Sequence, residues 1–487
     1  MNNFNIIINN YFDLFKLFKL SIYTLLKLLY INLNYKCINN SLEFYNFKRF
    51  YLIKHISERL LKLNPNYLKI IQSICLQKDF LTKEEQNYLI KYTNNVPFKN
   101  SDVNFDLINF LKYNNVIFEN NEPINSGVTA LVYKGKYKNK DIAIKVLKNN
   151  AEINMFDCLN TIQLLINCIS FLPFIKDFNL QSIFILNKKI MLEQLDFIIE
   201  KNNLLKFSES CQNYDYIKIP KIYIIENDIS NNYQKNNFSD LKFNNKFLLL
   251  EYIYGFDIKT LIEFNNKNLN KIFGEKILNF GLISILMTSC IHCDLHAGNF
   301  ILNVKDLNNN KILNNNEIIN IFSDKNENIN NENINYNNYE FILNIIDFGL
   351  AIFPSKDTQH TYYEYFDKIF IKQDYINGSE YTLINLIENF DGKKTLYSKN
   401  FNYAKNDLYN LFKSYNAKDY DLEIFYKINK IINKYEFKFK DEMLKIQISL
   451  AISYNMTKNL LGENGINAVT KKLMTELYKF NQIINFD

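Results

Sequence analysis

The fold is decided by one stretch of the chain, Ile291-His292-Cys293-Asp294-Leu295-His296-Ala297-Gly298-Asn299-Phe300-Ile301-Leu302, read together with Ile345-Ile346-Asp347-Phe348-Gly349. In the first stretch an Asp and an Asn stand five positions apart, and an apolar, β-prone segment follows. In the second, an apolar strand ends in Asp-Phe-Gly. Carboxylate and amide oxygens are hard ligands that suit Mg²⁺, and this arrangement is typical of phosphoryl-transfer sites. We therefore predict that Asp294 orients or deprotonates the acceptor, and that Asn299 and Asp347 bind Mg²⁺.

The segment from Val116 to Leu147 predicts three strands joined by two turns. The third strand reads Asp141-Ile142-Ala143-Ile144-Lys145-Val146-Leu147 and supplies a lysine for the α- and β-phosphates of a nucleotide. The turn before it, Asn125-x-Gly127-x-x-Ala130-x-Val132, keeps only one glycine of a phosphate-covering G-x-G-x-x-G loop. These patterns and the later strand Phe247–Glu251 predict a nucleotide site formed by Gly127, Ala130, Val132, Ala143, Lys145 and Glu251.

A phosphate-binding lysine needs a carboxylate that holds its ammonium group in place. The helical run Gln194-Leu195-Asp196-Phe197-Ile198-Ile199-Glu200 supplies a candidate. We predict that Glu200 pairs with Lys145, so that the catalytic set is Lys145, Glu200 and Asp294. The alternative for Glu200 is an exposed glutamate on a helix surface.

A zinc site is the rival interpretation of the first stretch, because Cys290, His292, Cys293, Asp294 and His296 are all metal-ligand types. Zinc sites of this kind usually have a second ligand pair at a set spacing, and no such pair follows Cys290 and Cys293. The Mg²⁺ interpretation also accounts for Asn299 and Asp347, so it is preferred. His292 is expected to support the catalytic loop.

Length and composition favour two or three domains with a large core, since the chain has 487 residues and 47% hydrophobic content. The formal charge of +6 is a mild excess, which solvated faces explain better than nucleic-acid binding. Seven cysteines without a clear secretory signal favour reduced thiols in an intracellular setting, cytoplasmic or organellar. The oligomeric state stays open.

The N-terminal run from Tyr11 to Tyr30 is apolar but is interrupted by Lys16, Lys19 and Lys27. The three lysines leave no window of 18 to 20 uncharged apolar residues, so the run is not expected to span a membrane. Three alternatives remain for this region: it lies on a membrane surface, it is an organelle-targeting segment, or it docks on the rest of the protein. Docking is the simpler interpretation.

The predicted organisation is α+β and two-lobed. An apolar helical segment covers residues 1–50, and an extension follows at 51–100, where Thr82 and Glu85 form a capping-box pattern. A small β-rich lobe is expected at 101–258 and a helical lobe at 259–487. Asn-rich tracts at about 226–245 and 303–338 are expected to be surface insertions, with strands 300–303 and 341–346 pairing beside the second.

Together these motifs resemble the UbiB-type atypical kinase-like proteins of ubiquinone biosynthesis, also named for the activity of the bc1 complex. The shared features are the His-x-Asp-x-His-x-Gly-Asn loop, the helix motif from Gln194 to Asn203, and an N-terminal segment at Lys69-Ile70-Ile71-Gln72. The resemblance covers about residues 55–355. It implies a protein-kinase-like fold with a helical N-terminal extension, ATP and Mg²⁺ as cofactors, and ATPase-like, lipid-associated activity. It also implies that the segment bearing Lys69 and Gln72 covers the active site and regulates access.

Four positions depart from the family pattern. Ile71 replaces a glycine, Gln194 replaces a glutamate, Gly127 stands where the family usually has alanine, and Ala297 replaces a proline. The four central residues Lys145, Asp294, Asn299 and Asp347 are retained, so nucleotide binding is expected. The alternative is a catalytically weak, nucleotide-binding pseudokinase scaffold.

Overall fold

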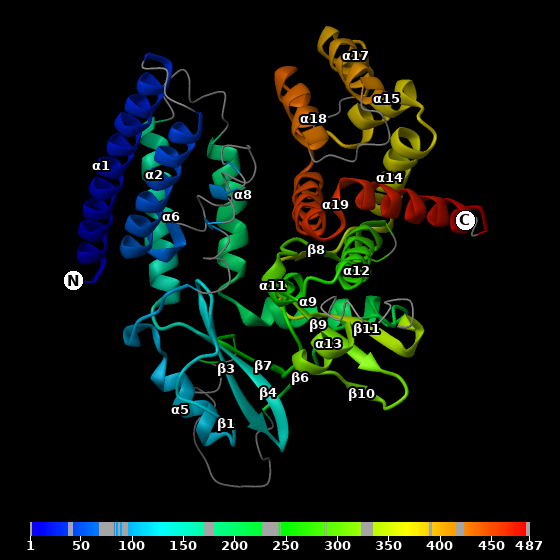
Figure 1. The fold of residues 1–487 in the computed structure, drawn as a ribbon. Helices are drawn as coiled ribbons and strands as arrows, with labels where there is room; N and C mark the ends of the chain where they lie inside the picture. Colours follow the sequence, from blue (N-terminus) through cyan, green and yellow to red (C-terminus); the bar gives the residue numbers. More distant parts are fainter. Residues whose placement is uncertain are drawn as a thin grey trace. The chain divides into compact units, whose positions relative to one another are not determined.

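The computed structural model describes residues 2–37, 42–67, 96–169, 180–225, 245–286, 290–322, 335–388, 392–414 and 423–483, together with the single positions 82, 84, 85, 88, 89, 243 and 288. The chain divides into two compact units (Figure 1). The first comprises Met1–Ile199 with Lys221–Tyr252, and the second comprises Glu200–Pro220 with Ile253–Asp487. Helices and strands are both abundant, which confirms the predicted α+β class.

The helical part of the first unit contains α1 (Asn2–Cys37), α2 (Leu42–Leu63), α6 (Ala151–Ile169) and α8 (Leu180–Glu193), which lie side by side in Figure 1. Helix α1 packs against α2 and α6 through an inward face on which Leu17 and Ile31 are buried. Helix α2 ends just before Asn64-Pro65. The Asn64 side chain then donates to Asn154 O of α6 at 2.7 Å.

The capping box in the extension is also confirmed. Thr82 N donates to Glu85 Oε2 at 2.7 Å, and Glu85 N donates to Thr82 Oγ1 at 3.3 Å. The Glu85 side chain is buried, and its other carboxylate oxygen lies 3.0 Å from Arg49 Nε of α2. This ion pair ties the capping box to α2.

The sheet of the first unit has the strand order β1-β3-β4-β7-β6, and β2 pairs with β3. Its strands are β1 (Ile117–Phe118), β2 (Asn125–Ser126), β3 (Ala130–Tyr137), β4 (Lys140–Leu147), β6 (Ile222–Tyr223) and β7 (Phe247–Glu251). The short helices before it are η1 (Asn100–Asp102) and α5 (Phe105–Tyr113). One face of the sheet packs on α5, and its core includes Leu107, Leu111, Leu131, Ile142, Ile144 and Leu249.

The second unit begins with most of α9 (Phe197–Ser210) and has a sheet of order β10-β9-β11-β5. Its strands are β5 (Ile217–Lys218), β9 (Phe300–Asp306), β10 (Lys311–Ile312) and β11 (Tyr339–Ile345). Strands β9 and β11 pair antiparallel, with Phe300 opposite Ile345 and Val304 opposite Phe341, which confirms the predicted pairing beside the Asn-rich tract. A separate two-stranded antiparallel sheet pairs β8 (Ile291–His292) with β12 (Ala351–Ile352).

The Asn-rich tract itself is more structured than the sequence predicts. Strand β10 and helices α13 (Asn315–Phe322) and η4 (Tyr336–Asn338) lie within it, and residues 323–334 lie outside the described part. Ile318 and Phe322 of α13 are buried, and the Phe322 ring packs 5.0 Å from that of Tyr339. Two apolar side chains one turn apart therefore anchor this part of the tract to β11. The earlier tract at 226–245 lies mostly outside the described residues.

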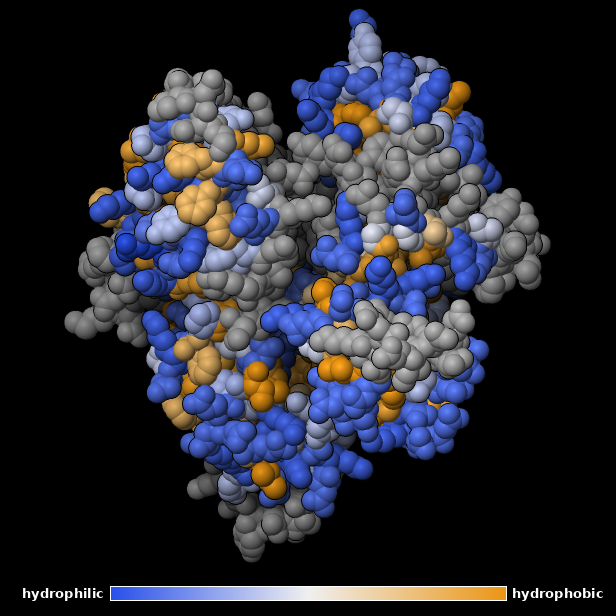
Figure 2. Space-filling view, in the orientation of Figure 1, coloured by the Kyte–Doolittle hydropathy of each residue, from blue (hydrophilic) through white to orange (hydrophobic). Residues whose placement is uncertain are grey.

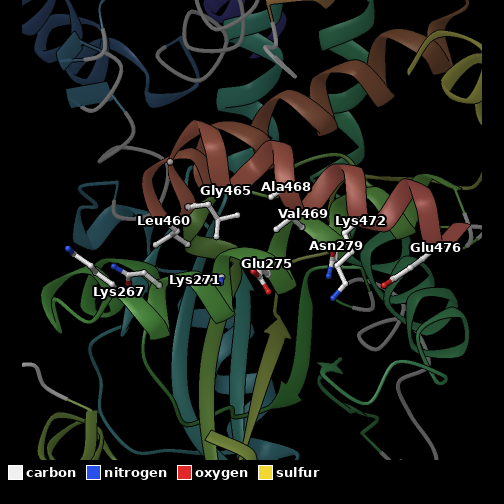
Figure 3. Close-up of a pocket in the computed structure, with 13 residues that line it drawn as sticks. Lys267, Lys271, Glu275, Asn279, Leu460, Gly465, Ala468, Val469, Lys472 and Glu476 are labelled. Atoms are coloured by element: carbon white, nitrogen blue, oxygen red, sulfur yellow. The ribbon is translucent and has the colours of Figure 1, made fainter. Parts of the chain in front are cut away.

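The helical lobe of the second unit contains α11 (Ile258–Glu263), α12 (Lys267–Leu286), η2 (Ala297–Asn299), α14 (Lys356–Phe366), η5 (Asp367–Ile371), α15 (Tyr375–Asn385), α16 (Gly392–Leu396), α17 (Lys399–Ser414), α18 (Glu423–Lys434) and α19 (Asp441–Ile483). Helix α12 packs along α19, which is kinked at Gly462. A shallow cleft of about 610 Å³ lies between them, with Lys271, Glu275 and Lys472 on its walls (Figure 3). Among the described residues, no helix is long and apolar enough to cross a membrane.

Candidate functional site

The open face of the sheet in the first unit carries most of the predicted nucleotide-binding residues. Directly opposed residues of antiparallel strands point to the same face, and Val132 of β3 lies opposite Lys145 of β4. Ala143, two positions before Lys145, shares that face. All three are half-buried, and the Lys145 ammonium lies 5.4 Å from the centre of the Phe197 ring. The face therefore combines apolar side chains with the Lys145 ammonium, and Lys134, opposite Ala143, lies on the same face.

Glu251 is an exception among these residues. Its position in β7 lies opposite Ile142, whose side chain is in the core under α5, so the Glu251 side chain points away from the Lys145 face. The carboxylate instead accepts a hydrogen bond from Lys221 N at 3.2 Å. The role of Glu251 in nucleotide binding therefore stays a prediction. The register between β4 and β7, which the sequence does not give, places its side chain on the face opposite Lys145.

The predicted phosphate loop forms the turn between β2 and β3. Gly127 N donates to Ala130 O at 2.9 Å, so this amide closes the turn. Ser126 O accepts from Val96 N at 2.7 Å, which attaches the end of the N-terminal extension to the strand that leads into the loop. A methyl group at Gly127 would meet only Ala130 O, at 3.7 Å, so this turn does not itself require glycine.

In the second unit, His292 is the central support of the catalytic loop. Its ring is buried and donates from Nε2 to the carbonyl oxygen of Asp347, while Nδ1 accepts from Asp294 N at 3.2 Å. These two bonds require the neutral ring with its proton on Nε2. Burial lowers the pKa of His292, against the opposing effect of the Asp347 carbonyl. The neutral ring therefore joins the two predicted motifs.

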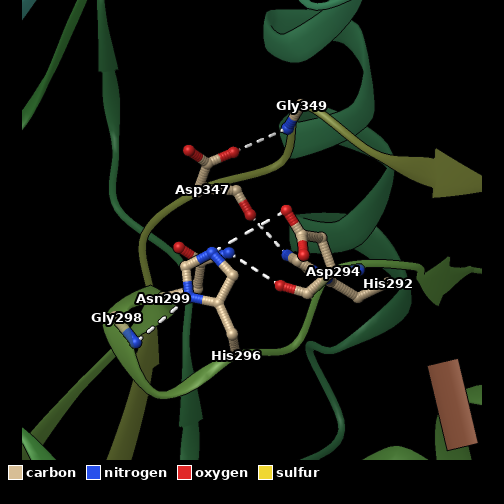
Figure 4. A network of polar contacts seen from close by, with 7 residues as sticks. All are labelled: His292, Asp294, His296, Gly298, Asn299, Asp347 and Gly349. Atoms are coloured by element: carbon tan, nitrogen blue, oxygen red, sulfur yellow. Dashed lines mark hydrogen bonds and ion pairs between the residues drawn. The ribbon is translucent and has the colours of Figure 1, made fainter. Parts of the chain in front are cut away.

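Asp294 and Asn299 are connected within the loop (Figure 4). Asn299 Nδ2 donates to Asp294 O at 2.7 Å. The backbone carbonyl of Asp294 accepts from the amide nitrogen of the Asn299 side chain, so the amide oxygen of that side chain is directed elsewhere and can bind a cation. The Asp294 carboxylate lies 3.7 Å from His296 Nε2, and His296 Nδ1 accepts from Gly298 N at 3.2 Å. His296 thus faces the predicted catalytic carboxylate with a fixed ring.

Asp347 lies just beyond β11, close to the same loop. Its Oδ1 accepts from Gly349 N at 2.9 Å, and the next residue back, Ile346, donates its N–H to Asn299 O at 3.1 Å. The residues Asp294, Asn299 and Asp347 are therefore brought together by backbone bonds that involve both motifs. Carboxylate and amide oxygens suit Mg²⁺ by their hardness, so the donor set fits that ion.

Helix α9 supports this region from behind. Asn203 Nδ2 donates to Phe348 O at 2.9 Å, and the buried Phe348 ring packs against Phe207 and His292. Glu200, one turn earlier, is also buried, so it is not an exposed helix glutamate. Lys145 belongs to the first unit and Glu200 to the second, so their pairing stays a prediction.

The zinc alternative finds no support in the described part of the chain, where no three His, Cys, Asp or Glu side chains are placed to hold a metal. Cys290 Sγ lies 3.1 Å from Ser210 Oγ, whereas Cys293 Sγ is directed at Ile291 O. Burial raises the pKa of both thiols. The predicted regulatory residues Lys69 and Gln72 lie outside the described residues.

Two supporting residues escape sequence reasoning. Ser449 of α19 donates to His292 O at 2.6 Å, and Asn203 bonds Phe348 O as described. Their partners stand 157 and 145 positions away in the sequence. For Asn203, the one hint in the sequence is its place at the end of the motif from Gln194 to Asn203. Ser449 lies in no motif, so nothing in the sequence points to it.

A scan against family models matches residues 115–381, a little over half of the chain, to the ABC1 atypical kinase-like domain. The chain is 27% identical over 203 residues to a mitochondrial ABC1 family protein of Saccharomyces cerevisiae, and 24% identical over 187 residues to AarF domain-containing kinase 1 of Drosophila melanogaster. These matches cover 38% and 37% of this chain, and 28% and 32% of those proteins. The chain thus spans less than half the length of these relatives.

A third relative, an uncharacterized protein of Synechocystis, is 24% identical over 264 residues, covering 53% of this chain and 43% of that protein. Among solved structures, Rv3197 of Mycobacterium tuberculosis in complex with erythromycin aligns with a TM-score of 0.44 and 13% identity. That alignment covers 82% of this chain and 90% of the other.

Proposed function

The chain belongs to the ABC1 atypical kinase-like family, and we propose on this premise that it binds ATP with Mg²⁺ and hydrolyses or transfers the γ-phosphoryl group. Its membership confirms the UbiB-type resemblance. The observation that carries the proposal is the bonded network of the second unit, in which His292 joins the backbones of Asp294 and Asp347. Phosphoryl transfer depends on positioned charge, and this network positions charge.

Each residue of the network has a separate role in the proposal. Asn299 and Asp347 would hold Mg²⁺ through their side-chain oxygens, and the ion would neutralise charge on the phosphates. Asp294 would orient or deprotonate the acceptor hydroxyl or water, with His296 beside its carboxylate. His292 is a positioning residue, because it acts through the backbones of Asp294 and Asp347.

Lys145 would contact the α- and β-phosphates from the open sheet face, where Val132 and Ala143 form an apolar surface for the base. The buried Glu200 is proposed to hold the Lys145 ammonium. If they act as a pair, Lys145→Met and Glu200→Gln each lower nucleotide affinity, and the double variant loses no more than the worse single variant. Additive losses would show that the two residues act independently.

Beyond the chemistry, we propose that the activity serves quinone and lipid metabolism, and that the segment carrying Lys69 and Gln72 regulates access to the site. Both statements rest on family membership. Deleting residues 68–81 would then raise turnover with an added acceptor. Unchanged turnover in a folded deletion variant would remove the regulatory role.

The direct test is nucleotide binding and turnover with and without Mg²⁺. We expect ATP affinity to depend on Mg²⁺, and Asp347→Asn to abolish turnover. Glu263→Gln, an exposed carboxylate on α11, is the matched control and should retain full activity. Mg²⁺-independent binding, or normal turnover in Asp347→Asn, would contradict the proposal.

A pseudokinase scaffold is the second candidate, and one observation favours it. The Gly127 amide, which a phosphate would need, is already bonded to Ala130 O. A scaffold binds nucleotide but does not turn it over. Steady hydrolysis that is lost in Asp294→Asn would exclude the scaffold, whereas binding without hydrolysis in the wild type would establish it.

A further inference from the structure

The surface of α1 has an exposed apolar stripe along its outward side. The stripe consists of Phe15, Phe18, Ile22, Leu26, Leu29 and Leu33, each between 44% and 65% exposed. Their spacing of three or four residues places them on one face of a helix, over a length of about 27 Å at 1.5 Å per residue. Single exposed apolar residues are ordinary, but a continuous stripe of this size marks an interaction surface.

Docking of α1 on its own unit explains only the other side of the helix. Leu17 and Ile31 are buried on that inward side, where α1 packs against α2 and α6. The outward stripe is left without a partner among the described residues. The sequence prediction that this segment docks on the protein is therefore correct for one face and leaves the second face to be explained.

The charge of the hairpin indicates the kind of partner. Residues 1–63 hold nine Lys and Arg against three Asp and Glu, a net charge of +6, which equals the formal net charge of the whole chain. The two helices α1 and α2, the first of which carries the stripe, thus form a cationic cluster. Two copies meeting through α1 would bring two such clusters together, which Coulomb repulsion opposes. An anionic surface complements the same cluster.

The flank of the stripe has the composition of a membrane interface. The Lys27 ammonium lies 5.8 Å from the Tyr23 ring and 5.9 Å from the Tyr30 ring, and Lys48 of α2 lies 5.2 Å from the Phe44 ring. A groove of about 360 Å³ between α1 and α2 brings Lys27, Lys48 and several tyrosines to its walls. Tyrosine and lysine beside apolar side chains suit the headgroup region. Figure 2 shows apolar and hydrophilic side chains mixed over this part of the surface.

We propose that the α1–α2 hairpin docks on an anionic phospholipid bilayer. Helix α1 lies in the plane of the surface, the stripe enters the acyl boundary, and Lys19, Lys27 and Lys48 meet lipid phosphates. The docking requires no nucleotide, so it stands apart from the proposed enzymatic activity and can fail or succeed separately.

The test uses the full chain without nucleotide, and flotation with vesicles measures binding. We expect binding to phosphatidylcholine vesicles that contain phosphatidylglycerol and little binding to phosphatidylcholine alone. Lys27→Gln and Lys48→Gln should each weaken binding about fivefold, the change that about 1 kcal/mol per lysine gives. The double variant Leu26→Glu/Leu29→Glu should abolish binding, while Ile376→Glu, equally exposed on α15, should not.

A second measurement reports how deeply the stripe enters the bilayer. Because the chain contains no tryptophan, a single introduced tryptophan is a specific fluorescent probe. Leu29→Trp introduces a single probe in the stripe, and Tyr113→Trp introduces one at an exposed site on α5. Emission of the first should shift to the blue on anionic vesicles and be quenched by brominated acyl chains, while the second should not change. Equal behaviour of the two probes overturns the proposal.

Two other outcomes overturn it as well. Equal binding to neutral vesicles would remove the role of charge. A wild-type oligomer that ignores vesicles and becomes monomeric in Leu26→Glu/Leu29→Glu would assign the stripe to self-association. Size-exclusion chromatography with light scattering and circular dichroism on every variant separates these outcomes from misfolding.

Discussion

The hydrogen bonds by which His292 connects the two catalytic motifs can be tested by substitution of this residue. Its ring satisfies two backbone groups, Asp294 N and Asp347 O, in a fully buried position. Leucine has a similar size but forms neither bond. A buried polar group without a partner costs about 1–3 kcal/mol, so His292→Leu should lower the free energy of unfolding by about 2–6 kcal/mol.

Two further variants separate the bonds. The side-chain oxygen of Asn stands near the place of Nδ1 and can accept from Asp294 N, while the amide of Gln reaches toward the place of Nε2 and can donate to Asp347 O. Each should restore part of the loss seen with leucine. The same residues should also affect turnover, since His292 positions Asp294 and Asp347.

Hydrogen exchange provides the local assay. The Asp294 amide is the donor in one of these bonds, so its exchange should be about five- to 150-fold faster in His292→Leu and His292→Gln, which corresponds to the loss of about 1–3 kcal/mol. In His292→Asn it should stay close to wild type. Urea unfolding gives the global change. Wild-type exchange and stability in His292→Leu would refute the reasoning.

Three further predictions follow from single contacts. Burial lowers the pKa of His292 below its ordinary value of 6.5, so between these two pKa values the unfolded chain binds a proton at this residue and the native state does not. The free energy of unfolding should therefore fall as the pH drops below about 6.5. This part of the loss should be absent from the pH profile of His292→Gln. Gly127→Ala should raise the free energy of unfolding by about 0.4–1 kcal/mol, measured by urea unfolding, because the methyl group meets only Ala130 O at 3.7 Å. Arg49→Met should lower the free energy of unfolding by about 3–5 kcal/mol, because it leaves the buried Glu85 carboxylate without its cation. Glutamine at position 85 keeps an oxygen that can accept from Thr82 N but carries no charge, so thermal unfolding in which Arg49→Met/Glu85→Gln is no more stable than Arg49→Met would contradict this.

The sequence alone predicted those features that depend on neighbours within a few positions. The strands within Val116–Leu147 and the capping box at Thr82 both follow from local spacing and local hydrogen bonds. The contact between Asp294 and Asn299 is also local, because the two residues stand only five positions apart in one loop. The family also follows from local motifs, since each is a short pattern.

Tertiary structure decided what depends on pairing between distant segments. The register between β4 and β7 decides on which face of the sheet the Glu251 side chain lies. The position of α13 depends on the packing of Phe322 against Tyr339. The tautomer of His292 is set by a carbonyl 55 positions away, and Ser449 supports it from 157 positions away. Such contacts leave no periodic trace in the chain, because side-chain spacing records only the geometry of one element and not which element it meets.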